Sequence, residues 1–253
     1  MIDYCTIIAT ERELEILPLH LNSLKHYSGD FNLKVSVAEN LENHAVFDRF
    51  DIDVLFHPTY TQLLAHPGLR QAGFDCANRM DKLMQACTSD WVILSQLDII
   101  WKQDVMPKLR PLMTDEYGMI GIWPHGCTVV NRNVYEGCHH AFWPNGGWLG
   151  RIHSEDPPMI QLIGNREGSG QPWWKIGSGI PGHLINIDGV DVGMLIKMEM
   201  QGYGYNFNYG GVNSCYHHIG GVSFHGLTDG DEAIKKSIIA REQHALDKYR
   251  RFR

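Results

Sequence analysis

The fold is decided by residues 77–101, ANRMDKLMQACTSDWVILSQLDIIW. The first part continues a segment, 71–88, whose apolar residues recur at the spacing of an amphipathic helix. These residues are Phe74, Ala77, Met80, Leu83, Met84 and Cys87. The apolar run WVIL at 91–94 then predicts a buried strand that runs on towards Asp98. Ligands of open α/β sheets bind beyond the carboxyl ends of the strands, so this pattern puts Asp98 where a ligand would lie.

Strands and helices alternate along the rest of the chain, which predicts an α/β fold with a mostly parallel sheet flanked by helices. Further strands are expected at 4–9, 33–38, 53–57, 119–123, 184–187 and 204–209. Further helices are expected at 13–27, at 190–201 and from residue 231 onward. Residues 124–182 are rich in Gly, Pro, Trp and His with little periodicity, which indicates a loop-rich, functional insertion.

The bulk composition restricts the class of protein. The 253 residues are enough for one large α/β domain, and we expect a single domain over 1–253. A net charge of −7 argues against a nucleic-acid partner held by phosphate contacts. No run approaches the roughly 18 apolar residues that span a bilayer, and the first residues do not read as a signal peptide. The six cysteines show no metal or disulfide spacing, so we expect reduced thiols in a cytoplasmic protein.

The triplet Gln96-Leu97-Asp98 resembles the Asp-X-Asp motif of the GT-A glycosyltransferases, in which a strand ends in acids that hold a divalent cation on a nucleotide-sugar diphosphate. Asp98 takes the place of the last Asp, and Gln96 replaces the first. The resemblance implies a GT-A fold, a hexosyltransferase-like activity and Mn²⁺ or Mg²⁺ as cofactor. A cation with oxygen ligands stabilises the charge that develops on a diphosphate leaving group. With one carboxylate instead of two, the donor diphosphate would largely carry the cation, or the cation would be dispensable.

The same resemblance divides the domain into a nucleotide-binding half (1–101), an acceptor and catalytic half (102–230) and a basic C-terminal helix (231–253). In the family, the loops after the first two strands grip the base and ribose. In this sequence, Arg79 on the helix before the motif is a candidate to reach the diphosphate, the alternative being a solvated helix residue. The implied nucleotide-binding residues are Thr10, Glu11, Glu39, Asn40, Arg79, Gln96, Leu97 and Asp98. The donor favoured by this resemblance is a UDP-sugar.

Two acids, Asp188 and Asp191, lie at the start of the helix expected at 190–201. They resemble the family's acid at a helix start that faces the acceptor. In inverting members this acid is the general base that takes the proton of the acceptor hydroxyl. Asp191 is the first candidate and Asp188 the second. An N-cap role explains either residue equally well, because Asp is favoured at helix starts by hydrogen bonding and by the helix dipole.

Late in the chain, Cys215-Tyr-His-His-Ile-Gly-Gly resembles the segment where many metal-dependent GT-A enzymes have a His that completes the metal site. His218, expected on a loop before Gly220, is the first candidate and His217 the second. An imidazole ligand favours Mn²⁺ over Mg²⁺. Because the chain has 14 His, a purely structural role is the default interpretation for any single one of them.

Five of the seven Trp lie in the irregular middle segment or, in the case of Trp123, directly before it. Sugar rings stack on aromatic planes, so we expect some of these Trp to bind a glycan or glycolipid acceptor and others to pack in the interior. The candidate acceptor-binding residues are Trp123, Trp173, Trp174, Glu155 and Asp156.

The segment 231–253 has seven Lys or Arg and four acids, a net charge of +3. We expect its Ile and Tyr face to pack on the body. The alternative is peripheral contact with the anionic inner face of a membrane. Two other functions compete with the transferase. One is a degenerate, non-catalytic protein that binds a sugar nucleotide or glycan, and the weaker one is a metal-dependent hydrolase using Asp98, His217 and His218.

Overall fold

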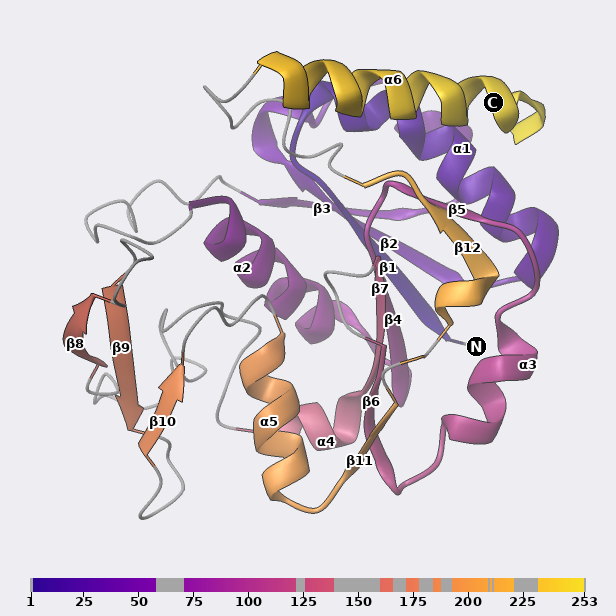
Figure 1. Cartoon of the computed structure of the whole chain (residues 1–253). Helices are drawn as coiled ribbons and strands as arrows, with labels where there is room; N and C mark the ends of the chain where they lie inside the picture. The colour runs from indigo at the N-terminus through magenta and orange to yellow at the C-terminus, as the bar shows by residue number, and fades with distance from the viewer. Residues whose placement is uncertain are drawn as a thin grey trace.

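The computed structural model describes residues 2–57, 71–121, 126–138, 160–165, 172–177, 184–187, 193–208, 210, 212–220 and 232–252. A seven-stranded sheet forms its centre, with strand order β11-β6-β7-β4-β1-β2-β3 (Figure 1). These strands are β1 (Asp3–Ile8), β2 (Asn32–Ala38), β3 (Asp53–His57), β4 (Trp91–Ser95), β6 (Tyr117–Ile120), β7 (Cys127–Asn131) and β11 (Asn206–Asn208). Only β7 runs against its neighbours β4 and β6, and the other pairs are parallel. The predicted mostly parallel α/β sheet flanked by helices is confirmed.

Helices cover both faces of the sheet, which explains why β1 is buried at every residue. Successive strand residues point to opposite faces. Tyr4 and Ile8 therefore pack towards α1, whereas Cys5 and Ile7 pack towards α2. The helices are α1 (Glu11–Ser28), α2 (Gln71–Ala86), α3 (Met106–Leu109), α4 (Arg132–Gly137), α5 (Met194–Gly202) and α6 (Glu232–Lys248). None of the helices within the described ranges has the length and apolar character needed to cross a membrane.

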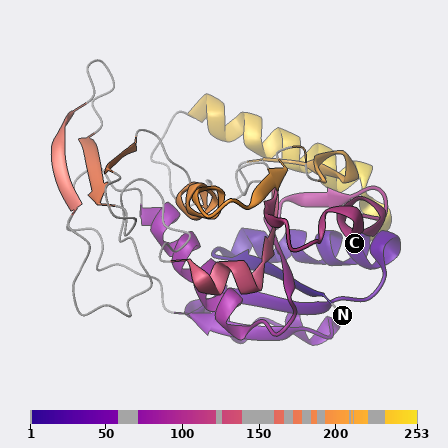
Figure 2. The same cartoon turned by 90° about the horizontal axis from the view of Figure 1, so that it is seen from below.

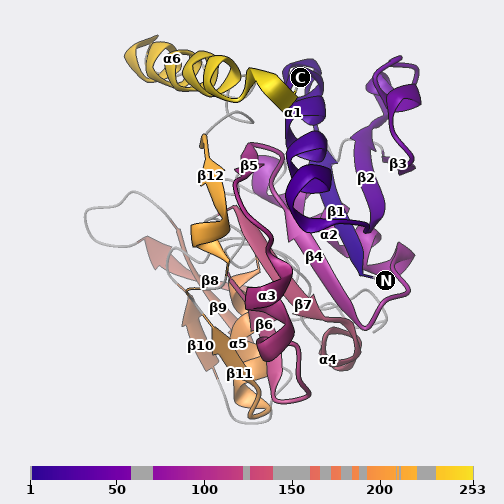
Figure 3. The ribbon, with the colours of Figure 1, turned by 90° about the vertical axis from the view of Figure 1, so that its right-hand side faces the viewer.

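The C-terminal helix α6 crosses over α1 in Figure 1, and Figure 3 shows its C-terminal end next to α1. Ile238, Ala245 and Tyr249 are buried, which is the packing face expected from the sequence. A buried carboxylate, Glu242, accepts two hydrogen bonds from the guanidinium of Arg12 at the start of α1. The helix is thus held to the body by both an apolar face and an ion pair.

The middle of the chain is more regular than the sequence indicated. It contains β7 and α4, and also β8 (Ile160–Asn165) and β9 (Pro172–Gly177). With β10 (Leu184–Ile187), the last two form an antiparallel sheet in the order β10-β9-β8, to one side of the main sheet in Figures 1 and 2. The strand expected at 184–187 therefore exists with the predicted bounds, but in the smaller sheet.

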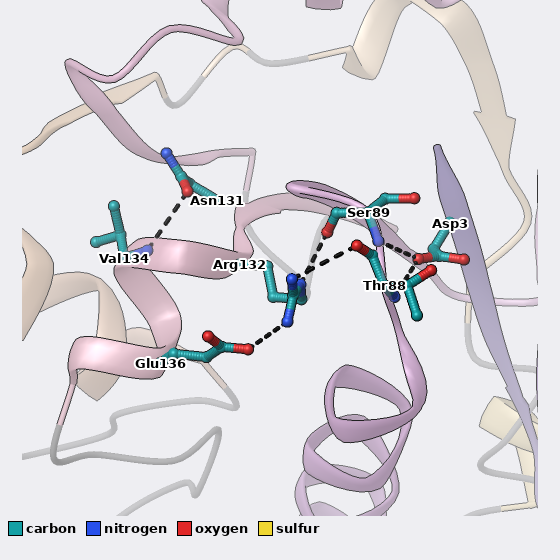
Figure 4. Close-up of polar contacts among 7 residues, drawn as sticks. All are labelled: Asp3, Thr88, Ser89, Asn131, Arg132, Val134 and Glu136. Carbon is teal, nitrogen blue, oxygen red and sulfur yellow. Dashed lines mark hydrogen bonds and ion pairs between the residues drawn. The ribbon is translucent and has the colours of Figure 1, made fainter. Parts of the chain in front are cut away.

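The turn between α2 and β4 is held by contacts with Asp3 and Arg132 (Figure 4), at the end of β4 opposite to the one that leads to Asp98. The Oδ2 of Asp3 accepts hydrogen bonds from the backbone N–H groups of Thr88 and Ser89, both at 2.8 Å. Burial acts to raise the pKa of Asp3, but these donors outweigh it and the pKa lies below its ordinary value. Arg132 Nε donates to the Ser89 carbonyl oxygen at 3.0 Å. These contacts fix where β4 begins, and hence where its other end delivers Asp98.

Candidate functional site

The loops after β1 and β2 lie at the carboxyl edge of the sheet. Thr10 is the N-cap of α1, and the buried carboxylate of Glu13 accepts hydrogen bonds from the N–H of Ala9 (2.6 Å), the N–H of Thr10 (2.9 Å) and the Thr10 hydroxyl (3.2 Å). This arrangement is a capping box, which satisfies N–H groups that a helix start leaves unpaired. Three of the other predicted nucleotide-binding residues are exposed at this edge: Glu11, Glu39 and Asn40.

The predicted motif forms the turn between β4 and β5 (Ile99–Trp101). The Gln96 N–H donates to the carbonyl oxygen of Gly126 at 2.7 Å, and the Asp98 carbonyl oxygen accepts from the N–H of Ile219 at 2.9 Å. Leu97 and Asp98 are both buried. The turn that presents the Asp98 carboxylate is therefore held from two different segments of the chain.

Sequence reasoning missed Gly126 as part of this site. Its φ is +109°, and a Cβ built on it would lie 2.7 Å from the Ile99 Cγ2. A side chain here would meet both backbone strain and a clash with β5. Nothing in the local sequence signals this role, because it depends on how closely β5 passes over residue 126.

His218 lies next to Asp98. It is the last residue of β12 (Tyr216–His218), a strand that pairs antiparallel with β5 and sets His218 opposite Ile99. The His218 Nε2 is 3.3 Å from the Asp98 Oδ1. Although that distance suits an ion pair, Nε2 is buried and has no aligned hydrogen-bond partner among the described residues. The structure thus places a carboxylate and a covered imidazole nitrogen side by side at the carboxyl edge of the sheet.

His217 faces the other way. The segment that was expected to be a loop is a strand, so adjacent side chains alternate between its faces. The His217 ring lies 5.7 Å from the ring of Tyr249, beyond the end of α6. Burial, together with the positive charges of Lys248 and Lys102, lowers the pKa of His217 below its ordinary value. Of the two candidate ligands, His218 is the one that contacts Asp98.

Arg79 lies elsewhere on the same edge and is fully buried. Its Nη1 donates to the Ser36 hydroxyl and its Nη2 to the carbonyl oxygen of His57, both at 3.4 Å. The Ser36 hydroxyl is also 2.8 Å from the Nδ1 of His57. Arg79 therefore joins α2 to the carboxyl ends of β2 and β3, and its contact with a diphosphate remains a prediction.

Several candidates lie outside the described residues, namely Asp188, Asp191, Trp123, Glu155 and Asp156. The backbone of Trp173 and Trp174 belongs to β9, but their side chains are likewise outside the described part. Helix α5 begins at Met194 with Gly193 as its N-cap, at φ +81°. The N-cap position of α5 is therefore Gly193, and Asp188 and Asp191 precede it in the sequence.

The donor atoms of the Asp98–His218 pair fit a divalent transition metal. A carboxylate oxygen and an imidazole nitrogen both suit Mn²⁺, and a buried nitrogen without an aligned hydrogen bond is available as a ligand. Within the described part of the chain, no group of three or more His, Cys, Asp or Glu is arranged to hold a metal. The pair by itself supplies two protein ligands.

No protein-family model matches the sequence, and neither does any curated protein. Solved structures that match include mouse xyloside xylosyltransferase 1 in its apo form, with 11% identity and a TM-score of 0.37 over 53% of this chain and 68% of that one. The mannosyltransferase PcManGT from Pyrobaculum calidifontis, in complex with GDP-Man and Mn²⁺, matches with 10% identity and a TM-score of 0.38 over 53% of this chain and 46% of that one. The galactosyltransferase LgtC, in complex with donor and acceptor sugar analogs, matches with 13% identity and a TM-score of 0.40 over 53% of this chain and 59% of that one.

The matched part of this chain thus spans about half of PcManGT and somewhat more of LgtC. At these identities and TM-scores, no residue role is transferred from any of the three proteins.

Proposed function

We propose that the protein is a glycosyltransferase that moves a sugar from a nucleotide-diphosphate sugar to a hydroxyl acceptor. The observation that carries this proposal is the contact between Asp98 and His218 at the carboxyl edge of the sheet, 3.3 Å from Oδ1 to Nε2. Open α/β sheets bind ligands at this edge. The two side chains come from segments 120 residues apart, and their contact joins the variant Asp-X-Asp motif to the late His that resembles a metal ligand.

In the proposed site, Asp98 and His218 hold a divalent cation, with Mn²⁺ favoured by the imidazole. A bound cation supplies electrostatic stabilisation of the diphosphate leaving group. His218 binds through Nε2, so its Nδ1 carries the proton. Because the pair supplies two ligands, we assign the remaining positions to the donor diphosphate and water. Gln96, a neutral amide in place of the motif's first acid, contacts the donor without adding charge.

On the acceptor side, we assign the general base to Asp191, with Asp188 as the second candidate. A base at this position takes the proton of the acceptor hydroxyl as the acceptor oxygen bonds to the anomeric carbon and the nucleoside diphosphate leaves from the opposite face. This single displacement inverts the anomeric configuration. The proposed donor is a UDP-sugar and the proposed acceptor a glycan or glycolipid, contacted by Trp123, Trp173, Trp174, Glu155 and Asp156.

Thermal shift with UDP-, GDP-, CMP- and dTDP-sugars, each with Mn²⁺ or with EDTA, tests donor binding, since a ligand that binds the native state raises its apparent stability. Release of the nucleoside diphosphate then measures turnover. Asp98→Asn and His218→Ala should abolish the Mn²⁺-dependent shift and the turnover. His217→Ala is the matched control, because it removes a neighbouring imidazole that faces Tyr249 instead, and it should retain both. The proposal is wrong if no sugar nucleotide binds, or if Asp98→Asn and His218→Ala behave like the wild type.

One observation favours a second candidate, a protein that binds a sugar nucleotide or glycan without turnover. Gln96 removes a carboxylate from the motif, which weakens the protein's own hold on a cation. The same two assays separate the candidates. Tight Mn²⁺-dependent binding with no diphosphate release from any donor, with or without acceptor sugars, would identify the binding protein.

A further inference from the structure

The short strand β5 lies next to both members of the Asp98–His218 pair. Asp98 directly precedes Ile99, the first residue of β5, and His218 is the register partner of Ile99 on β12. β5 is not part of the seven-stranded sheet, and β12 covers only one of its edges. Its other edge faces α1, as the order of β12, β5 and α1 in Figures 1 and 3 shows. Whatever holds that second edge also holds the pair.

Two side chains of α1 take the place of a neighbouring strand at this edge. Ile99 and Trp101 are completely buried, so their outward backbone groups need partners. The Ile99 carbonyl oxygen lies 2.8 Å from the Nδ1 of His20, and the Trp101 N–H donates to the Ser23 hydroxyl at 3.0 Å. His20 and Ser23 are three residues apart and share one face of the helix. Two backbone groups on this edge of β5, one at each end of the strand, are therefore hydrogen-bonded by α1 side chains.

The protonation of His20 follows from its partners. Burial lowers the pKa of His20 to about 4, so the ring is neutral at physiological pH. A carbonyl oxygen only accepts, hence Nδ1 carries the proton and Nε2 is an acceptor. The Tyr4 hydroxyl, 2.9 Å away, donates to Nε2 and itself accepts from the Trp101 Nε1–H at 3.0 Å. The chain of hydrogen bonds thus begins and ends in β5, and its direction is fixed throughout.

We propose that His20 is a positioning residue for the Asp98–His218 pair, acting through the Ile99 carbonyl. This inference rests on the cation site proposed above. His20 contacts neither ligand by a hydrogen bond. It fixes the backbone of Ile99, which follows Asp98 in the sequence and is the register partner of His218. Loss of its Nδ1 donor leaves a buried carbonyl without a partner, and β5 then relaxes away from the geometry that brings the two donor atoms together.

The test measures the affinity for Mn²⁺ in the presence of UDP, by electron paramagnetic resonance of free Mn²⁺, well below the unfolding temperature of every variant. His20→Asn keeps an amide donor near the place of Nδ1, whereas His20→Gln places its amide near Nε2, and His20→Phe has no polar atom. We expect His20→Phe and His20→Gln to weaken Mn²⁺ binding roughly 10- to 100-fold, as loss of groups that orient metal ligands does, and His20→Asn to restore most of it. Leu83→Ala on α2 is the matched control. It removes buried apolar volume on the opposite face of the sheet, so it lowers stability but leaves Mn²⁺ affinity unchanged.

The outcomes separate this inference from the proposed function. If the wild type binds no Mn²⁺ with UDP, the proposed cation site itself fails. If the wild type binds and Asp98→Asn does not, but His20→Phe and His20→Gln bind like the wild type, the positioning role is overturned while the site stands. Equal losses in His20→Asn and His20→Gln, or a matching loss in Leu83→Ala, also overturn it, because affinity would then follow stability rather than the Nδ1 donor. Should His20→Phe fail to fold, the comparison of the Asn and Gln variants decides alone.

Discussion

The ion pair between Arg12 and Glu242 joins the C-terminal helix to the body, and its removal should both destabilise the fold and loosen α6. The Glu242 side chain is 4% exposed and that of Arg12 is 29% exposed. Both hydrogen bonds of the guanidinium go to the same oxygen, Oε2, with Nε at 2.7 Å. Arg12→Met therefore leaves a buried carboxylate without its counter-charge.

The expected magnitude follows from the unequal burial. Removing one partner of a fully buried pair costs about 3–5 kcal/mol. Because water reaches one side of Arg12, we expect Arg12→Met to cost about 2–3 kcal/mol. Glu242→Gln leaves a neutral amide that still accepts from Arg12 and should cost about 1–2 kcal/mol. The double variant should lose less stability than the sum of the two single variants, by a coupling energy of about 1–2 kcal/mol.

Urea unfolding of the wild type, both single variants and the double variant measures these free energies. Asp53→Asn is the control, since it breaks an ion pair with Lys34 in which the Asp is 70% exposed, and it should cost at most about 1 kcal/mol. Amide hydrogen exchange in Arg12→Met should rise in α6 and in β12, where His217 packs against Tyr249. A cost for Arg12→Met no larger than that of the control, with unchanged exchange in α6, would refute the reasoning.

Three further outcomes are expected. Gly126→Ala should destabilise the protein by about 1–3 kcal/mol in thermal unfolding, because it adds strain at positive φ and a clash with Ile99, whereas Gly137→Ala, with open space around its Cβ, should not. The pKa of His20 falls from 6.5 to about 4 on folding, so between pH 6.5 and pH 4 this imidazole is protonated in the unfolded state but neutral in the folded state. The free energy of unfolding should therefore drop by up to about 3 kcal/mol as the pH falls from 6.5 to 4. His20→Asn should lack this part of the pH dependence in acid titrations followed by circular dichroism. The protein should not float with anionic liposomes, because Ile239 is the one large apolar side chain exposed among the described side chains of α6. The prediction is wrong if the wild type floats and the Lys236→Glu variant does not.

Regular periodicity was enough to predict most of the main sheet and its helices. β3 has the predicted bounds, and α1, α2, β1, β2 and β4 differ by a few residues at their ends. β7 was missed because its five residues, CTVVN, are buried on both faces and so show no alternation, in a segment dominated by Gly, Pro and Trp. The expected start of α5 at residue 190 is too early. Gly193, in a left-handed conformation, is the N-cap, and the helix begins at Met194.

The choice between His217 and His218 could not be made from the sequence because it depends on the pleat of a three-residue strand. β12 exists only through its pairing with β5, more than 110 residues earlier, and a Tyr-His-His run has no strand pattern of its own. Shifting that register by one residue would turn His217 to Asp98 and His218 to α6. The register is fixed from both sides: the Ile219 N–H donates to the Asp98 carbonyl oxygen, and the Lys102 N–H donates to the Cys215 carbonyl oxygen. The identity of the candidate ligand is therefore a tertiary property, and variants that disturb β5 should change metal affinity even when Asp98 and His218 are both intact.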